Sequence, residues 1–158
     1  MSAMRTMVTR GLLAAAVASA AGFGLAGGAT AGRDDRFTLR LVEIEGPGEY
    51  LDLGAPGESR GDILLFNNQL LERNGDPAGR ARGVCTKATD ARFHCVGSLR
   101  LDGGTLQLAN TIRFTEDQPT RFAITGGTGA YRDAFGQAVA TPTTPGRFRL
   151  VITGGHAR

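Results

Sequence analysis

The stretch Arg147-Phe148-Arg149-Leu150-Val151-Ile152 alternates charged and apolar side chains and ends in two β-branched residues. The same pattern with a period of two recurs at 37–41, 106–114 and 121–124. Such alternation with β-branched and aromatic residues is typical of strands that bury one face. No stretch after residue 31 carries an apolar stripe of period 3.6 and helical length. The sequence therefore predicts an all-β fold.

Dipeptides that favour turns separate the alternating segments. They are Gly46-Pro47, Asn74-Gly75, Asp102-Gly103, Gly126-Gly127 and Pro145-Gly146. The predicted strands lie at about 36–45, 49–53, 61–72, 79–88, 92–101, 104–115, 120–126 and 134–152, with a break of the last one at 142–145 as an alternative. Eight short strands predict a sandwich or a closed barrel, and the pattern alone does not choose between them. An eight-stranded barrel has an interior that side chains fill or that holds one small ligand.

The first 31 residues have the three-part pattern of a secretory signal. Arg5 and Arg10 precede an apolar run at 11–25, and Ala29 and Ala31 are small residues that suit a signal peptidase. The alternative, a membrane anchor, needs about 20 strongly apolar residues, whereas glycine and serine dilute this run. We therefore expect cleavage near Ala31, a secreted protein with no membrane span after cleavage, and a single domain over 32–158.

The charge balance gives no indication of a nucleic-acid partner. The formal net charge of +3 falls to +1 when Arg5 and Arg10 are removed with the signal. Basic residues do not cluster beyond two or three arginines, and aromatic residues are few, so nucleic-acid binding is not expected. Two cysteines with His94 and His156 are too scattered to bind zinc, and we expect no metal site. His94 alternates with apolar neighbours and is predicted to face outward.

The two cysteines lie symmetrically about Asp90, which suits a hairpin that turns there. Such a hairpin places Cys85 opposite Cys95 and Gly83 opposite Gly97, and opposed residues of neighbouring strands come within disulfide range. In an exported protein, an even number of cysteines favours a disulfide. The alternative is a pair of reduced, buried thiols.

Three motifs occur in order along the chain. They are Gly61-Asp62-Ile63-Leu64-Leu65-Phe66-Asn67-Asn68-Gln69-Leu70, then Gly83-Val84-Cys85, then Ala123-Ile124-Thr125-Gly126-Gly127-Thr128-Gly129-Ala130-Tyr131 followed by Ala134-Phe135-Gly136-Gln137. They resemble motifs of plant allene oxide cyclases, and the glycine-rich motif also resembles dirigent proteins. The resemblance covers most of residues 37–154 and implies an eight-stranded antiparallel barrel with a hydrophobic lumen. The glycine run lacks the Lys-Ser/Thr of a phosphate-binding loop, so turn geometry is the expected role of these glycines.

The resemblance also implies where chemistry would occur. Allene oxide cyclases carry a glutamate in the first strand that supports the charge change at an epoxide, and Glu43 falls at that position. Alternation places Glu43 and Glu45 on the same face as Leu39 and Leu41, which is the apolar face. A carboxylate on an apolar face is unusual, so we predict Glu43 as the catalytic residue. The alternative is that both acids lie at a solvated rim.

The predicted substrate-binding residues are Glu45, Phe66, Asn68, Leu41 and Leu39. Asn68 matches an asparagine of the family, and the alternative is an ordinary edge or turn asparagine. Glu45 stands where the family has another asparagine, so the pair that holds a water on the epoxide oxygen is not reproduced. Cys85 matches a cysteine that lines the cavity of the cyclases. A disulfide to Cys95 would make Cys85 a structural cross-link rather than a residue that contacts the ligand.

Three functions fit these observations. The first is a cofactor-independent cyclase or isomerase that holds a reactive hydrophobic small molecule in one reactive conformation. The second is a non-catalytic dirigent-like stereocontrol protein or a carrier of hydrophobic metabolites, and the third is an exported barrel with a filled core and an interaction role. The resemblance implies no metal or organic cofactor, and a homo-oligomer, trimer or dimer, is an open alternative to a monomer. A lumen of about 300 Å³ or more suits the first two functions, and a packed core removes both.

Overall fold

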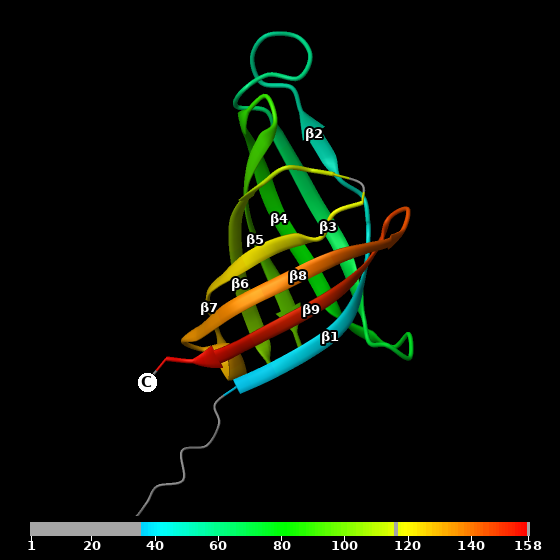
Figure 1. Ribbon diagram of the computed structural model, residues 1–158, viewed down its shortest axis with the longest axis vertical. Coiled ribbons are helices and arrows are strands. Elements are labelled where there is room, and N and C mark those ends of the chain that lie inside the picture. Colours follow the sequence, from blue (N-terminus) through cyan, green and yellow to red (C-terminus); the bar gives the residue numbers. More distant parts are fainter. Residues whose placement is uncertain (1–35, 116, 158) are drawn as a thin grey trace, which may run out of the picture. The chain divides into compact units, whose positions relative to one another are not determined.

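The computed structural model describes residues 36–115 and 117–157, which form a single antiparallel sheet closed into a barrel (Figure 1). The elements are β1 (Arg36–Ile44), β2 (Glu49–Leu51), β3 (Ile63–Leu71), β4 (Pro77–Thr89), β5 (Arg92–Leu101), β6 (Gly104–Ile112), β7 (Thr120–Gly127), the 3-10 turn η1 (Gly129–Tyr131), β8 (Ala134–Thr144) and β9 (Arg147–His156). The all-β prediction is confirmed. The predicted signal at 1–31 and its cleavage near Ala31 lie outside the described residues.

Eight strands close the barrel. From β3 to β9 each strand pairs antiparallel with the next one, and β9 pairs with β1 along the whole of β1. The ring closes because the end of β1 also pairs with β3, through Val42 with Leu71, Glu43 with Leu70 and Ile44 with Gln69. Strand β2 extends the sheet beside β3. The predicted eight-stranded antiparallel barrel is therefore confirmed, and the sandwich is excluded.

The last predicted strand is a hairpin rather than one strand. Strand β8 ends at Thr144 and β9 begins at Arg147, with Pro145 and Gly146 between them. Proline has no amide hydrogen for the ladder, and Gly146 has a φ of +69°, which glycine adopts without strain. The alternative of a broken last strand is therefore correct, but the break lies at 145–146 rather than 142–145, because β8 continues to Thr144 with only a register shift between Pro142 and Thr144.

Apolar side chains from the inward positions fill most of the barrel. The main buried cluster consists of Leu41, Leu70, Ala81, Leu99, Leu106, Leu108, Ile124, Ala134, Ala138, Ala140, Leu150 and Ile152. A smaller cluster joins Cys85, Cys95 and Ile112 to the partly buried rings of Phe66 and Phe93. The period of two read from the sequence therefore corresponds to inward and outward positions of a closed sheet.

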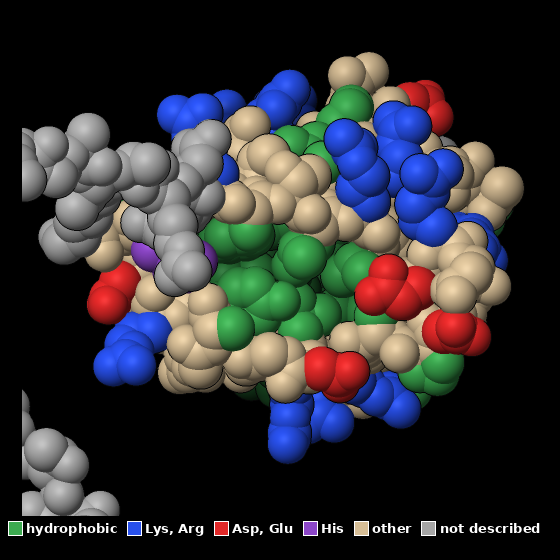
Figure 2. Space-filling model, turned by 90° about the horizontal axis from the view of Figure 1, so that it is seen from below, with side chains coloured by type: hydrophobic (Ala, Val, Ile, Leu, Met, Phe, Trp, Pro, Cys, Tyr) green, Lys and Arg blue, Asp and Glu red, His purple; other side chains and the backbone are tan. Residues whose placement is uncertain are grey.

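Aromatic side chains lie at the lower end of the barrel in Figure 1, where β1 begins and β9 ends. The ring of Phe37 packs edge-to-face on Tyr131, with ring centroids 5.6 Å apart, and it also contacts His156. From below, apolar side chains floor a shallow depression that is bordered mostly by backbone and uncharged polar side chains, with charged side chains farther out (Figure 2). Within the two described ranges, no helix is long and apolar enough to cross a membrane.

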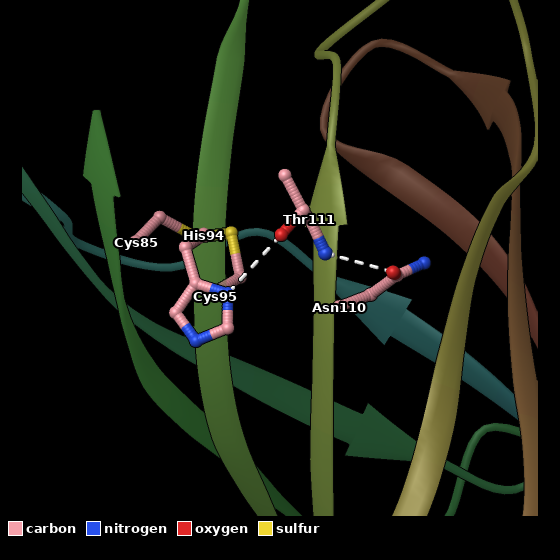
Figure 3. The surroundings of a disulfide bond; sticks show 5 residues. All are labelled: Cys85, His94, Cys95, Asn110 and Thr111. Atoms are coloured by element: carbon pink, nitrogen blue, oxygen red, sulfur yellow. Dashed lines mark hydrogen bonds between the residues drawn. A yellow bond between two sulfur atoms is a disulfide. The ribbon is translucent and has the colours of Figure 1, made fainter. Parts of the chain in front are cut away.

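The hairpin of β4 and β5 has the predicted register. Cys85 lies opposite Cys95 and Gly83 opposite Gly97, and the two cysteines form a disulfide with Cα atoms 4.0 Å apart (Figure 3). The exposed ring of His94 turns outward, where its Nδ1 lies 3.2 Å from the Thr111 hydroxyl. The predictions of the disulfide and of an outward-facing His94 are both confirmed.

Replacing both Cys85 and Cys95 by alanine is expected to lower the free energy of unfolding by about 3 kcal/mol, because the unfolded chain regains the entropy of an open loop. Urea denaturation of the wild type and the double variant measures this difference. The wild type under reductant should match the variant. A loss below about 1 kcal/mol in both cases would contradict a stabilising role for the disulfide.

Candidate functional site

A small cavity lies in the barrel interior, with a volume of about 50 Å³. Each of the eight barrel strands contributes to its lining. In chain order these contributions include Glu43, Phe66, Ala81, Leu99, Leu108, Phe122, Ala140 and Leu150. The space suits one or two waters and is several-fold smaller than the roughly 300 Å³ of a small-molecule site. By the criterion of lumen volume given above, the structure as it stands fits the filled-core function, and the two ligand-binding functions require side chains of the lumen to move.

Glu43 brings a carboxyl group to this apolar cavity. It follows Leu41 on the inward face of β1 and pairs across the closing seam with the fully buried Leu70. The other lining residues of the described chain are apolar, small or uncharged. Within the part of the chain that the structure describes, Glu43 is therefore the one ionisable group of the cavity.

Asn68 holds the Glu43 carboxyl group in place. Its Nδ2 donates a hydrogen bond of 2.7 Å to Oε1 of Glu43, and its Oδ1 accepts one of 3.1 Å from the backbone N–H of Gly46. Because a backbone N–H only donates, this second bond fixes the amide so that its NH₂ group faces Glu43. Asn68 lies on β3 two residues from Leu70, so the contact with Glu43 is a diagonal pair across the seam.

The environment of Glu43 favours the neutral acid. Burial raises the pKa of Glu43 above its ordinary value of 4.5, and the nearby Glu45 carboxylate adds to the increase. The hydrogen bond from Asn68 acts in the opposite direction because it stabilises the charged form. Desolvation is the largest cause, so the pKa of Glu43 is raised overall.

The ring of Phe66 limits the cavity. Phe66 lies opposite Gly83, and Gly83 lies opposite Gly97 on the next strand. A Cβ atom at Gly83 would lie 2.5 Å from Cζ of Phe66, and one at Gly97 would lie 3.1 Å from it. The two glycines therefore leave the space that the Phe66 ring occupies, and this ring fills the part of the lumen beside the disulfide.

The other predicted site residues are distributed differently. Glu45 is exposed just beyond the end of β1, so the rim alternative describes that residue, and only Glu43 faces the lumen. Leu41 is buried in the main cluster, and Leu39 packs against it from a partly exposed position. The structure thus brings together Glu43, Asn68 and Phe66 and places Leu39 and Leu41 in the packed core.

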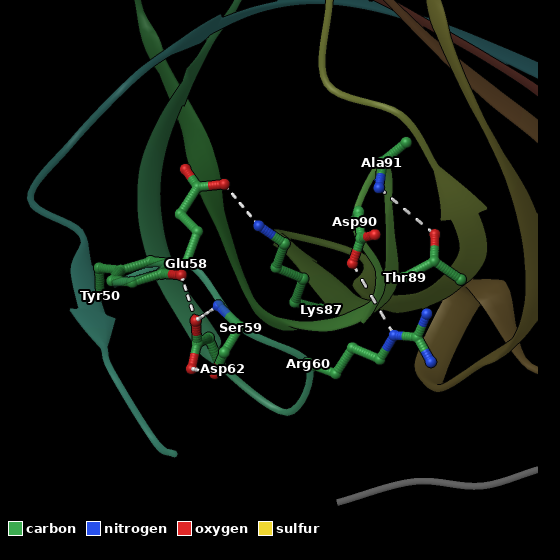
Figure 4. Close-up of polar contacts among 9 residues, drawn as sticks. All are labelled: Tyr50, Glu58, Ser59, Arg60, Asp62, Lys87, Thr89, Asp90 and Ala91. Atoms are coloured by element: carbon green, nitrogen blue, oxygen red, sulfur yellow. Dashed lines mark hydrogen bonds and ion pairs between the residues drawn. The ribbon is translucent and has the colours of Figure 1, made fainter. Parts of the chain in front are cut away.

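Polar contacts that the sequence interpretation missed lie at the upper end of the barrel in Figure 1 (Figure 4). The buried Asp62 carboxylate accepts hydrogen bonds from the Ser59 and Leu53 backbone N–H groups and, at 2.6 Å, from the Tyr50 hydroxyl. The bond from Ser59, followed by the one from Tyr50, holds the pKa of Asp62 well below its ordinary value. The loop between β2 and β3 is thereby fixed to the start of β3.

A buried lysine makes the second connection at this end. Lys87 is only 4% exposed and forms an ion pair with the exposed Glu58 of the same loop. Its ammonium group also lies 5.7 Å from the centroid of the Phe93 ring. Lys87 follows Cys85 on the inward face of β4, and this spacing was the one signal in the sequence that could have located it. In the described residues, no three His, Cys, Asp or Glu side chains gather as metal ligands.

Comparisons with known proteins agree with this geometry. Residues 43–152 match a family model described as an allene oxide cyclase barrel like domain. A solved structure named pyocyanin demethylase is 26% identical to the chain, with a TM-score of 0.67 over 75% of this chain and 99% of its own. A search of curated proteins finds no match.

Two further solved structures share the fold at lower identity. The pterocarpan synthase dirigent protein GePTS1 is 21% identical, with a TM-score of 0.62 over 78% of this chain and 89% of its own. The Diels-Alderase AbmU from Streptomyces koyangensis is 19% identical, with a TM-score of 0.63 over 80% of this chain and 71% of its own. Barrels of this shape therefore occur both in proteins named as enzymes and in a protein named as dirigent.

The raised pKa of Glu43 predicts how stability depends on pH. The folded chain keeps the Glu43 proton to a higher pH than the unfolded chain, so the free energy of unfolding should fall as the pH rises from about 4.5 through the folded-state pKa. Glu43→Gln removes this titration while Asn68 can still donate to the side-chain oxygen. Urea denaturation across this pH window should show a smaller fall for Glu43→Gln than for the wild type. The control is Glu49→Gln, which removes an exposed carboxylate of β2 that does not contribute to the pKa of Glu43. An equal fall in all three proteins would contradict the raised pKa of Glu43.

Proposed function

The chain belongs to the allene oxide cyclase barrel like family, and on that premise we propose that its lumen binds a reactive hydrophobic small molecule and steers its cyclisation or coupling to one stereochemical outcome. The observation that carries the proposal is the contact between Glu43 and Asn68 inside an otherwise apolar cavity. Burying a carboxyl group costs free energy, and a fold with only a structural requirement would place an apolar residue there.

The geometry suggests distinct roles for the two residues. Asn68 occupies Oε1 of Glu43 and leaves the second carboxyl oxygen available to a ligand in the cavity. Above its raised pKa Glu43 is ionised, and a carboxylate in a low-dielectric lumen stabilises developing positive charge more strongly than the same group in water. The surrounding apolar walls would hold the ligand in one near-attack conformation. Glu43 is the proposed catalytic residue, and Asn68 positions it.

Ligand binding requires the lumen to open. The cavity of about 50 Å³ is too small for a substrate, and Phe66 is the side chain whose rotation would enlarge it, because its ring rests against two glycines. A change of rotamer of the Phe66 ring is a faster and more local motion than a rearrangement of the strands. We propose that ligand entry displaces Phe66 away from Gly83 and Gly97 and exposes Glu43 to the ligand.

The names of the structural neighbours support a small-molecule role. The most similar of the three described above is named as a demethylase of pyocyanin, and the others are named as a pterocarpan synthase dirigent protein and a Diels-Alderase. The disulfide between Cys85 and Cys95 suits an extracellular protein. We propose that residues 1–31 direct export and are then removed.

The closed lumen favours a second candidate function. A barrel whose interior is filled by its own side chains can serve as an exported interaction protein with no internal ligand. The 50 Å³ cavity is the observation that supports this candidate. The two functions differ in whether the wild-type lumen admits an apolar molecule.

The admission of a neutral apolar probe to the lumen tests this difference. Indole titrated into the wild type and followed by NMR should shift the signals of Phe66, Phe122 and Leu108, which line the cavity. Phe66→Ala should bind indole more tightly, because removing the ring leaves a permanent cavity, at a cost of about 3–5 kcal/mol in stability. The control Leu65→Ala removes a neighbouring side chain that is 37% exposed. Indole binding to Phe66→Ala without any binding to the wild type would establish the filled-core alternative.

The catalytic assignment has its own test. A panel of hydrophobic epoxides, with product ratios read by chiral chromatography, should identify a substrate whose cyclisation the wild type accelerates. Glu43→Gln should then slow turnover by about 10²-fold while ligand affinity stays within about twofold, because charge stabilisation is lost and shape is kept. The matched control Glu49→Gln, at an exposed position of β2 outside the cavity lining, should change neither. An unchanged rate and product ratio for Glu43→Gln would contradict a catalytic role of the carboxylate. Confinement of the substrate by the apolar walls of the lumen would then be the whole mechanism.

A further inference from the structure

A second concave site lies on the outer face of the barrel, over β4, β5 and the start of β6. It is a cleft of about 430 Å³ whose lining includes Arg80, Arg82, Ser98, Arg100, Asp102 and Thr105. The arginines, Ser98 and Thr105 alternate with buried inward residues such as Ala81, Leu99 and Leu106, so the cleft is separated from the lumen by the sheet itself. Its volume falls in the range of small-molecule sites.

Like charges face each other across this cleft. Arg80 of β4 lies directly opposite Arg100 of β5, and both are exposed. Directly opposed like charges destabilise a strand pair. Over residues 36–115 and 117–157, no carboxylate forms an ion pair with either arginine, although Asp102 also lines the cleft. The unliganded cleft therefore carries an uncompensated repulsion that a bound anion would relieve.

The neighbouring polar groups suit an oxyanion. Arg82 is held by a hydrogen bond of 3.0 Å from its Nε to Oδ1 of Asn67, which leaves its terminal nitrogens free to donate to a ligand. Ser98 lies opposite Arg82, and Thr105 lies opposite Arg100, so two hydroxyl groups accompany the three guanidinium groups. Planar guanidinium groups recognise phosphate and sulfate oxygens with paired hydrogen bonds.

We propose that this cleft binds a small molecule through a multivalent tetrahedral oxyanion, either a phosphoryl or a sulfate group. Three arginines against one aspartate give the lining a net positive charge, and the volume leaves room for the rest of the ligand beside the charged group. Ser98 lines both the cleft and the internal cavity, but none of the charged residues of the cleft lines the cavity, so removing those charges tests the cleft separately from the lumen.

Calorimetric titration of the full chain with pyrophosphate, sulfate and citrate tests the proposal. Pyrophosphate or sulfate should bind more tightly than citrate, because the charged groups of citrate are planar carboxylates rather than tetrahedral oxyanions. Tighter binding of pyrophosphate than of sulfate would identify a phosphoryl ligand, and the reverse order would identify a sulfate ligand. The double variant R80Q/R100Q should lose at least about tenfold in affinity, and D102N should gain affinity because the acidic neighbour is removed. The matched control R147Q/R149Q removes two exposed arginines from β9, outside the cleft.

Three results would overturn the site. One is no binding of either oxyanion by the wild type at low ionic strength, and another is citrate binding equal to that of pyrophosphate and sulfate. The third is an equal loss of affinity in R147Q/R149Q and R80Q/R100Q, which would show attraction to net charge alone. Indole binding in the lumen should be unchanged in R80Q/R100Q, so failure of this site and failure of the proposed function are separable.

Discussion

The pairing of β1 with both β9 and β3 is the contact on which the barrel depends. Strand β1 lies along β9 over its full length, but only its last residues, Val42 to Ile44, reach β3. This short seam converts a curved sheet into a closed barrel and removes the two free edges of the ring. It also creates the candidate site, because Glu43 lies in the seam and its partner Asn68 comes from the other side of it. Barrel closure and the position of the carboxyl group therefore share one structural cause.

The filled lumen is the feature that most constrains the function. Two opposed glycines on β4 and β5 leave a space, and the Phe66 ring from β3 occupies it. A larger residue at Gly83 or Gly97 would collide with the ring, so the three positions form one packing unit. This packing leaves little free volume beside Glu43. Under the proposed function, displacement of the Phe66 ring would enlarge that space for a ligand.

Local pattern was sufficient to predict much of the fold. The period of two located the strands, and the symmetry of Cys85 and Cys95 about Asp90 predicted the register of the β4–β5 hairpin, because hairpin pairing follows directly from the position of the turn.

The candidate site depends on contacts that are distant along the chain. The orientation of Asn68 depends on the backbone of Gly46, and the exposure of Glu45 follows from the end of β1 at Ile44. The inward-facing Lys87 pairs with Glu58, a residue of a distant loop, and the lumen volume depends on how side chains from all eight barrel strands meet.

The protonation of Glu43 is the property that links burial, the Asn68 contact and the proposed chemistry. NMR titration of the ¹³Cδ signals of labelled glutamate reports it directly for each carboxyl group. Glu43 should titrate above its ordinary value of 4.5, and Asn68→Ala should raise its midpoint further, because the hydrogen bond that favours the charged form is lost. A Glu43 signal that titrates with the exposed glutamates and does not respond to Asn68→Ala would contradict a buried, positioned carboxyl group in the lumen.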